Sequence, residues 1–229
     1  MSLANSAGKI VLAIAAFSPS SFLCQETDKG ISADRYALKV KKAPALQEGL
    51  FTYTVCLQLP EGDRVSSVFG TDVHPFELAA PAGVFNSPFN AGWSASGMNP
   101  NFFKLMPEIQ DDSYATIGLR TGAQISGISG AEDPTMVQDA GAPWADFFTE
   151  DGAQRLLVNT HTGGAYFVLR TAANGAPVHG EVLLMQVTTA GGLSGALNIQ
   201  VFPESEGYDQ ARWRTTFEGP GEFPGTFID

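Results

Sequence analysis

Serines that stand among glycines are the first residues of this sequence that suggest chemistry. They occur in three segments: GWSASG at 92–97, GISGA at 127–131 and GLSGA at 192–196. A serine nucleophile of the G-x-S-x-G type needs a glycine two residues to either side, because it sits on a strained turn. None of the three segments has that spacing, so we interpret them as ordinary turns.

Metal-ligating and acidic residues are equally scattered. His74, His161 and His179 show no HxH or HExxH spacing, so the sequence predicts no metal centre and no other cofactor. The pair Asp111-Asp112 lacks the D-x-[DN]-x-[DN]-G pattern of a calcium loop and is interpreted as solvated turn residues. Paired carboxylates for glycoside hydrolysis stay open, because their separation is set by the fold. These residues do not predict an enzyme.

Cysteines and tryptophans suggest two further roles. Cys24 and Cys56 are the only cysteines, lie in no CxxC pair, and are candidates for one disulfide. Trp93, Trp144 and Trp213 are candidates to stack on sugar rings, which would make the protein a carbohydrate-binding module. Placement in a core or an interface is the commoner fate of such tryptophans.

Composition limits the class of protein. The 24 acidic and 13 basic side chains give a formal net charge of −11, which disfavours nucleic acid and anionic membranes as partners. No run approaches the roughly 20 apolar residues of a membrane span. Apolar residues make up 44% and charged residues 16%, with 16 Phe, 25 Gly and 14 Pro. This mixture is typical of many short strands joined by tight turns.

Two stretches with the two-residue period of a strand predict the centre of the fold. In residues 181–202, Leu197, Ile199 and Val201 alternate with polar residues, and glycines at 191 and 192 favour a hairpin turn. Residues 51–69 show the same design, with a turn at 60–63. We therefore predict two hairpins of similar length, which indicate two pseudo-equivalent halves.

Weaker patterns complete the predicted fold. Strands are expected at 36–40, where lysines would protect a sheet edge, and at 112–119, 166–170 and 212–217, with a helical turn in 143–148. The aromatic-rich residues 70–110 should pack as an irregular loop on the sheet. The predicted class is all-β: an antiparallel, jelly-roll-like β-sandwich with long irregular loops, spanning 23–217, followed by an extended C-terminal arm at 218–229.

The N-terminal residues 1–22 have two interpretations. Lys9 precedes a short apolar run at 10–16, followed by Phe17. The pattern is typical of a secretion or plastid-import signal, and equally of a first strand.

A series of motifs resembles a known β-rich module. It comprises VFGT at 68–71, FNSPF at 85–89, MNPNFF at 98–103, DSYATIG at 112–118 and the segment 180–203. Over residues 50–205 the series is similar to a module of marine algal and bacterial proteins, and resembles the pyrenoid shell proteins of diatoms. Tyr114-Ala115 departs from the Trp-Val or Trp-Leu of many relatives. The resemblance supplies no catalytic residues; it implies a shell around the Rubisco-containing pyrenoid, a plastid location, and pyrenoid components as partners.

Two functional hypotheses follow. In the first, the protein is non-enzymatic and structural, with copies of itself as partner in a sheet or tube. Aromatic residues of the loops and of the C-terminal arm are the candidate self-assembly contacts: Phe85, Phe89, Phe102, Phe103, Trp213, Phe217, Phe223 and Phe227. In the second, the protein is a secreted carbohydrate-binding β-sandwich. A jelly-roll enzyme ranks third.

Overall fold

The computed structural model describes residues 31–207 and 209–229. The chain divides into the units Met1–Ile31 and Ser32–Asp229, and the description below concerns the second. The interpretations of residues 1–22, and Cys24 of the candidate disulfide, lie outside the described residues.

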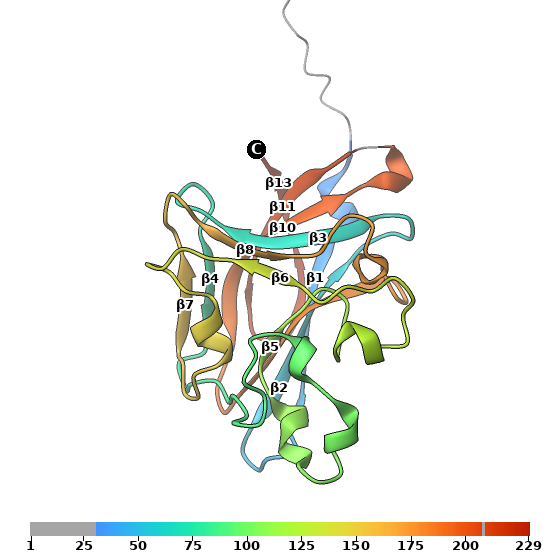
Figure 1. Cartoon of the computed structure of the whole chain (residues 1–229). Coiled ribbons are helices and arrows are strands. Elements are labelled where there is room, and N and C mark those ends of the chain that lie inside the picture. The colour runs from blue at the N-terminus through green and yellow to red at the C-terminus, as the bar shows by residue number, and fades with distance from the viewer. Residues whose placement is uncertain (1–30, 208) are drawn as a thin grey trace, which may run out of the picture. The chain divides into compact units, whose positions relative to one another are not determined.

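Two antiparallel sheets form the domain (Figure 1). Sheet A has the order β12-β1-β2-β9-β5, with β1 (Ala37–Pro44), β2 (Phe51–Gln58), β5 (Tyr114–Ala115), β9 (Glu181–Thr189) and β12 (Gly221–Pro224). Sheet B has the order β13-β11-β10-β3-β8-β6, with β3 (Arg64–Gly70), β6 (Thr135–Val137), β8 (Gly164–Phe167), β10 (Ser194–Phe202), β11 (Ala211–Glu218) and β13 (Thr226–Ile228). Beside it, β4 (Phe76–Ala79) pairs with β10 and with β7 (Arg155–Val158).

Every helix in the described part of the chain is a short 3-10 helix. They are η1 (Ala33–Arg35), η2 (Ala95–Gly97), η3 (Pro100–Phe102), η4 (Pro107–Asp111), η5 (Ala123–Ile125), η6 (Ala145–Phe148), η7 (Ala173–Gly175) and η8 (Glu204–Glu206). The helical turn expected in 143–148 is therefore confirmed as η6. None of the described helices is long and apolar enough to cross a membrane.

The core lies between the sheets, as the two-residue period predicted. Val55 and Leu57 of β2 and Leu197 and Ile199 of β10 are all fully buried in it. The predicted β-sandwich is thus confirmed.

The predicted hairpins are wrong in their pairing, although their strands are right. β9 belongs to sheet A and β10 to sheet B, so the connection between them is an arch that crosses the sandwich. The physical reason is that β9 is buried along both faces from Val182 to Thr189. Such a strand must lie at the centre of a covered sheet, where β2 pairs with it on one side and β5 on the other.

The second expected hairpin is also an arch, from β2 in sheet A to β3 in sheet B. The two arches lie against each other, because β2 pairs antiparallel with β9 and β3 pairs antiparallel with β10. Each ladder contains a register shift, at Val55/Cys56 and at Gln200/Val201. The two segments therefore have equivalent positions, because each forms an arch from sheet A to sheet B.

The C-terminal segment does not extend away as an arm. Its residues form β12, which pairs with β1, and β13, which pairs with β11. The Phe223 ring contacts Phe217 at a centroid distance of 6.0 Å, and the Phe227 ring contacts Tyr36 at 6.0 Å. The segment thus completes both sheets of its own domain, and β1 is not the edge strand that its lysines suggested.

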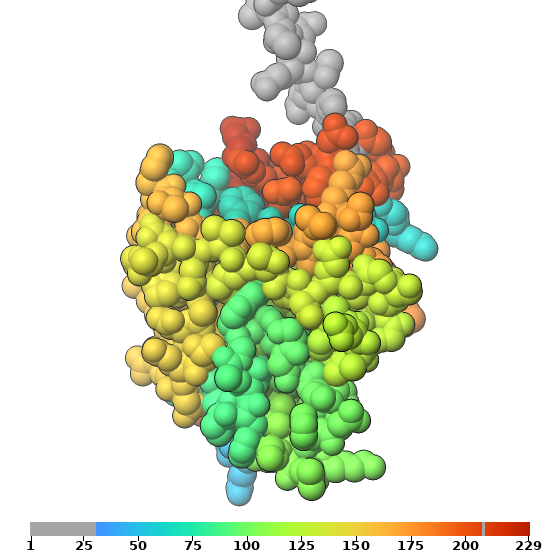
Figure 2. Space-filling model, viewed as in Figure 1, coloured from blue at the N-terminus to red at the C-terminus, as the bar shows by residue number. Residues whose placement is uncertain are grey.

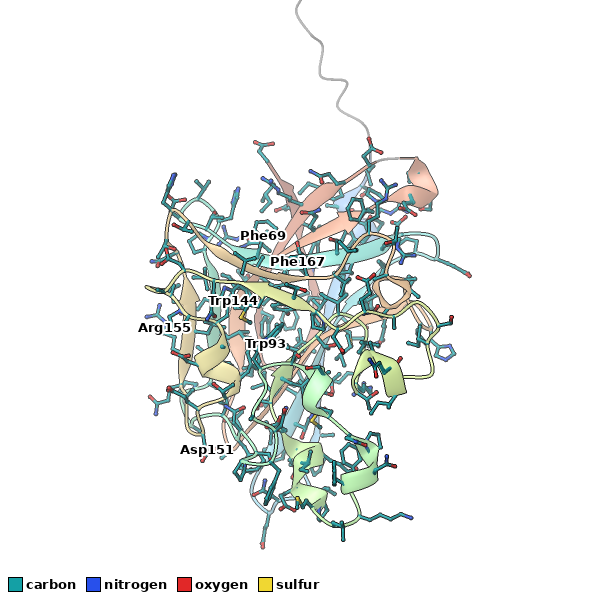
Figure 3. The ribbon with its side chains drawn as sticks, in the orientation of Figure 1. Phe69, Trp93, Trp144, Asp151, Arg155 and Phe167 are labelled. Carbon is teal, nitrogen blue, oxygen red and sulfur yellow. The ribbon has the colours of Figure 1, made fainter. Side chains whose placement is uncertain are left out.

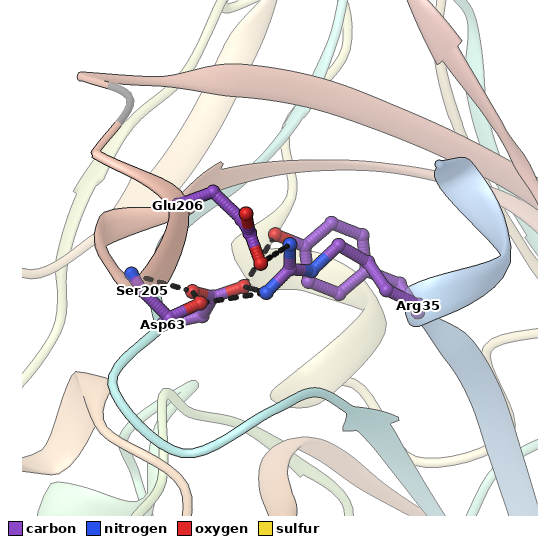
Figure 4. A network of polar contacts seen from close by, with 5 residues as sticks. Arg35, Asp63, Ser205 and Glu206 are labelled. Atoms are coloured by element: carbon purple, nitrogen blue, oxygen red, sulfur yellow. Dashed lines mark hydrogen bonds and ion pairs between the residues drawn. The ribbon is translucent and has the colours of Figure 1, made fainter. Parts of the chain in front are cut away.

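A buried carboxylate joins three distant segments (Figure 4). Asp63, with no exposed surface, accepts hydrogen bonds from the Tyr36 hydroxyl (2.8 Å) and from the Ser205 amide and hydroxyl (3.1 and 2.5 Å). The Arg35 guanidinium lies 3.0 Å from the same carboxylate and 3.1 Å from Glu206. Asp63 therefore fastens η1 and η8 to the arch between β2 and β3.

We predict that Asp63→Ala lowers the free energy of unfolding by about 3 kcal/mol, because it leaves Arg35 and Tyr36 without their buried partner. Glu206→Gln is the matched control: the Glu206 side chain is 54% exposed, so its loss should cost less than about 1 kcal/mol. Urea unfolding measures both. Equal effects of the two substitutions would show that the buried carboxylate is not the fastening point.

Candidate functional site

The most unusual feature of the domain is a layer of irregular chain on the outer face of sheet A. We call residues 85–119 the loop layer; they run in green across the lower half of Figure 1. A second apolar cluster lies beneath the layer, joining Cys56 and Leu183 of sheet A to Met98, Ile109 and Leu119 of the layer. The expectation that residues 70–110 pack as an irregular loop on the sheet is confirmed for the part in this layer, whereas Phe76–Ala79 form the strand β4.

Two buried aspartates hold the loop layer in place, and the prediction that they are solvated turn residues is wrong. Asp111 is 3% exposed, and its carboxylate accepts hydrogen bonds from the amides of Leu46 (2.9 Å) and Gln47 (2.8 Å). This contact fixes the turn between β1 and β2 against η4. Backbone amides of irregular segments need acceptors, and the aspartate supplies two of them.

Asp112 performs the same task inside the layer. Fully buried, it accepts hydrogen bonds from the Ser87 amide and the Asn90 side chain, both at 2.6 Å. A Cβ on Gly97 would lie 1.8 Å from the Asn90 amide oxygen, so only glycine fits there. Gln186 of β9 donates to the carbonyls of Gln110 and Asp112, both at 2.9 Å, and so ties the layer to the sheet.

Burial raises the pKa of Asp112 from 3.8 to about 7, although its hydrogen bonds from Ser87 and Asn90 favour the charged form. No cation forms an ion pair with this carboxylate among the described residues. The carboxylate is thus a structural hydrogen-bond acceptor whose ionised form is destabilised by burial.

Apolar side chains are exposed at the lower end of this layer and on the neighbouring β1–β2 turn. Leu105 is 78% exposed, Leu46 61% and Phe102 49%. Leu46 lies in the β1–β2 turn that Asp111 holds, Phe102 is the last residue of η3, and Leu105 lies in the turn that follows. Figure 2 shows both segments at the lower end of the molecule. We call Leu46, Phe102 and Leu105 the loop tip.

A cavity of about 500 Å³ opens beside Cys56, between the segments 118–128 and 176–181. Its lining mixes apolar Leu119 and Ile125 with Arg120 and Glu181. Burial raises the pKa of the Cys56 thiol to about 11, with a further contribution from Glu181. The thiol is therefore protonated at neutral pH and unsuited to attack. Because Cys24 lies outside the described residues, the candidate disulfide stays a prediction.

The histidines serve separate local contacts. His74 Nε2 lies 3.2 Å from the Asp229 carbonyl, His161 Nδ1 lies 3.1 Å from Asp72, and His179 occupies a turn with a positive φ of 53°. Within 31–207 and 209–229, no three His, Cys, Asp or Glu side chains are grouped so as to hold a metal ion.

Two of the three tryptophans are inaccessible to any sugar. Trp144 and Trp213 have no exposed surface; Trp144 contacts Phe76 and Tyr166 inside the sandwich, and Trp213 contacts Tyr36. Trp93 is partly exposed, with its ring 6.2 Å from that of Tyr166 (Figure 3). These two residues therefore cannot form the aromatic platform that the carbohydrate-binding hypothesis requires.

The candidate self-assembly contacts fall into two groups. Phe89 and Phe102 are about half exposed, and Phe85 and Phe103 are partly exposed on the loop layer. Trp213 and Phe217 are instead buried in the core, and Phe223 and Phe227 pack against it. The reason is that β11, β12 and β13 complete the two sheets, so the C-terminal aromatics cover the chain's own core.

Sequence reasoning missed Leu46 and Leu105 of the loop tip. For Leu105 a signal was present: it follows Lys104 in an irregular segment without strand alternation. For Leu46 there was none, because its position depends on the hydrogen bond from its amide to a distant aspartate.

Together the fold and the site define an antiparallel β-sandwich with one sheet covered by a fastened, aromatic-rich loop layer. Comparisons with protein-family models, with curated proteins and with solved structures find no match to this chain.

We predict that Asp112→Asn changes how stability depends on pH. The raised pKa means that the folded chain binds this proton more tightly than the unfolded chain, so the contribution is present below about pH 4 and is lost as the pH rises to about 7. The stability of the wild type relative to Asp112→Asn should therefore fall across this window, by at most about 1.4 kcal/mol per pH unit.

Urea unfolding of both proteins from pH 4 to 8 measures this difference. Since the two proteins share every other titrating group, the difference isolates Asp112. A difference that stays constant over the whole range would contradict the buried, weakly compensated carboxylate.

Proposed function

We propose that this protein is a non-enzymatic structural protein that self-assembles into a sheet or shell through its loop layer. The observation that carries the proposal is the loop tip: Leu46, Phe102 and Leu105 are roughly half to four-fifths exposed, and the Leu46 amide is bound by the buried Asp111 carboxylate. A rigid loop that presents apolar side chains loses little conformational entropy when a partner covers them.

The contact made by one tip is small, and stable interfaces bury about 1,200–2,000 Å² in total. Single contacts of this kind are weak. They become effective when every copy makes several of them in a repeating array. This supports a lattice of many copies over a discrete, tight dimer.

A finer proposal is that the array is the shell around an algal pyrenoid, in the plastid. Its support is the resemblance of the motif series, whose segments 85–89, 98–103 and 112–118 are the ones that build the loop layer. Within them, the Asn99 side chain caps η3 by accepting from the Asn101 amide (3.0 Å), and Asp112 holds Ser87. A family that shares this series is expected to share the layer.

The alternative, a secreted carbohydrate-binding module, has less support. It relied on the three tryptophans, and Trp144 and Trp213 are fully buried. Retention on a panel of immobilised polysaccharides would favour it over assembly.

We predict that Phe102→Ser/Leu105→Ser raises the protein concentration needed for half-maximal assembly at least about tenfold. Each substitution removes an apolar side chain whose burial contributes about 1.5–3 kcal/mol, and 1.4 kcal/mol corresponds to a tenfold change. Sedimentation together with electron microscopy of the purified protein measures assembly.

Ile125→Ser is the matched control, because Ile125 is also half exposed (51%) but lines the cavity beside Cys56. It should assemble like the wild type. A wild type that stays monomeric at high concentration would overturn the proposed function.

A further inference from the structure

The outer face of sheet B carries exposed and partly exposed side chains on β3, β6, β8 and β11. On β11, Trp213 points into the core, so Arg212 and Arg214 point outward. On β3 and β8, Val68 and Tyr166 point inward, so Phe69 and Phe167 point outward by the same alternation. Figure 3 shows Phe69 and Phe167 on one side of β8, and Trp144 and Trp93 on the other.

Cross-strand register brings these outward residues together. Phe167 lies opposite Ser67 of β3, two residues from Phe69, so the two rings are diagonal neighbours. Val137 of β6, 57% exposed, lies opposite Ala165, and Leu169, 59% exposed, follows β8. The face therefore carries a strip of apolar side chains across three neighbouring strands.

Arginines border this strip on the side of β11. The Arg212 guanidinium lies 5.8 Å from the centre of the Phe69 ring, and Arg214 is two residues further along the strand. Neither arginine forms an ion pair with any side chain in the described part of the protein. Arg212 donates a hydrogen bond to the Asp229 carbonyl (3.4 Å), and both guanidinium groups lack a side-chain carboxylate partner among the described residues.

The loop tip lies at the opposite end of the domain from this face. Figures 1 and 2 show β11, β13 and β3 at the upper end, and the segment around η3 and the β1–β2 turn at the lower end. Near the tip in the sequence are Glu48, which is exposed, and Glu108, which is partly exposed. The cations nearest in sequence are Lys104 and Lys42, and the Lys42 ammonium lies over the Phe51 ring at 3.8 Å. The tip thus offers two carboxylates beside its apolar side chains, and the face offers two guanidinium groups beside its apolar strip.

From this complementarity we propose that the outer face of sheet B binds the loop tip of a second copy of this chain. The inference rests on the proposed function and names the partner surface for it. The tip supplies Leu46, Phe102 and Leu105 to the strip of Phe69, Phe167, Val137 and Leu169, and its carboxylates face Arg212 and Arg214. Because the two surfaces differ, the contact is heterologous: each copy keeps a free tip or face for the next, so the contact repeats from copy to copy.

Mixing two variants, each defective in one surface, tests the proposal. The tip variant is Phe102→Ser/Leu105→Ser; the face variant is Phe167→Ser/Arg212→Glu, with Arg212→Glu/Arg214→Glu as a second version that leaves the apolar strip intact. At a concentration at which the wild type assembles, each variant alone should stay monomeric. An equimolar mixture joins one intact tip to one intact face through a single weak contact. It should therefore form 1:1 dimers only at concentrations well above that of wild-type assembly, and sedimentation velocity over a concentration series should detect them.

Three results would overturn the proposal. If the wild type assembles and the mixture stays monomeric throughout the concentration series, the two surfaces do not bind each other, although self-assembly stands. If both face variants assemble like the wild type, the face serves another partner, such as an acidic glycan or peptide. If the wild type never assembles, the proposed function and this inference both fail.

Discussion

The architecture depends on one constraint: β9 is apolar on both faces and must be covered on both. Its inward side chains, such as Val182 and Leu184, enter the core between the sheets, and Leu183 faces the other way into the second apolar cluster. A two-layer sandwich covers only one face of each sheet. The loop layer, which is the long irregular segment of the sequence, covers the outer face of sheet A.

When irregular chain covers a sheet, some of its buried backbone amides lack hydrogen-bond acceptors, and the buried aspartates supply them. A loop has no ladder to satisfy its amides, and a buried amide without an acceptor costs free energy. Asp111 and Asp112 accept four hydrogen bonds between them, three from backbone amides and one from Asn90. Burying these carboxylates costs free energy because their charge is removed from water, and the raised pKa of Asp112 reflects that cost. Through its hydrogen bonds, Asp111 fixes the β1–β2 turn that carries the exposed Leu46.

The sequence predicted what its local periodicity encodes. Alternation located β2 and β10 and separated core from surface there, since that pattern records which face of a strand is buried. The continuous apolar run of β9 located a strand that is covered on both faces. Neither pattern records which strand lies alongside, so both arches were interpreted as hairpins. The prediction that Phe223 and Phe227 lie on an extended arm is wrong for the same reason. Only the strand order shows that β1 and β11 each pair with one further strand, β12 and β13. The burial of Asp112 was equally hidden, since its partners Ser87 and Asn90 bind it through the fold and not through a short motif.

The position of the C-terminal segment in both sheets has a consequence for how the protein reaches its structure. β12 lies beside β1, and β13 contacts η1. The first two and the last two elements of the described chain are therefore neighbours. Contacts between segments so distant in sequence form late and make folding slow, because a long loop must close before they are rewarded. On the ribosome, the edge of β1 around Leu38 would stay unpaired until residues 221–224 had emerged. Newly made chains would therefore depend on rapid completion, or on a chaperone, to keep that edge from pairing with the wrong strand.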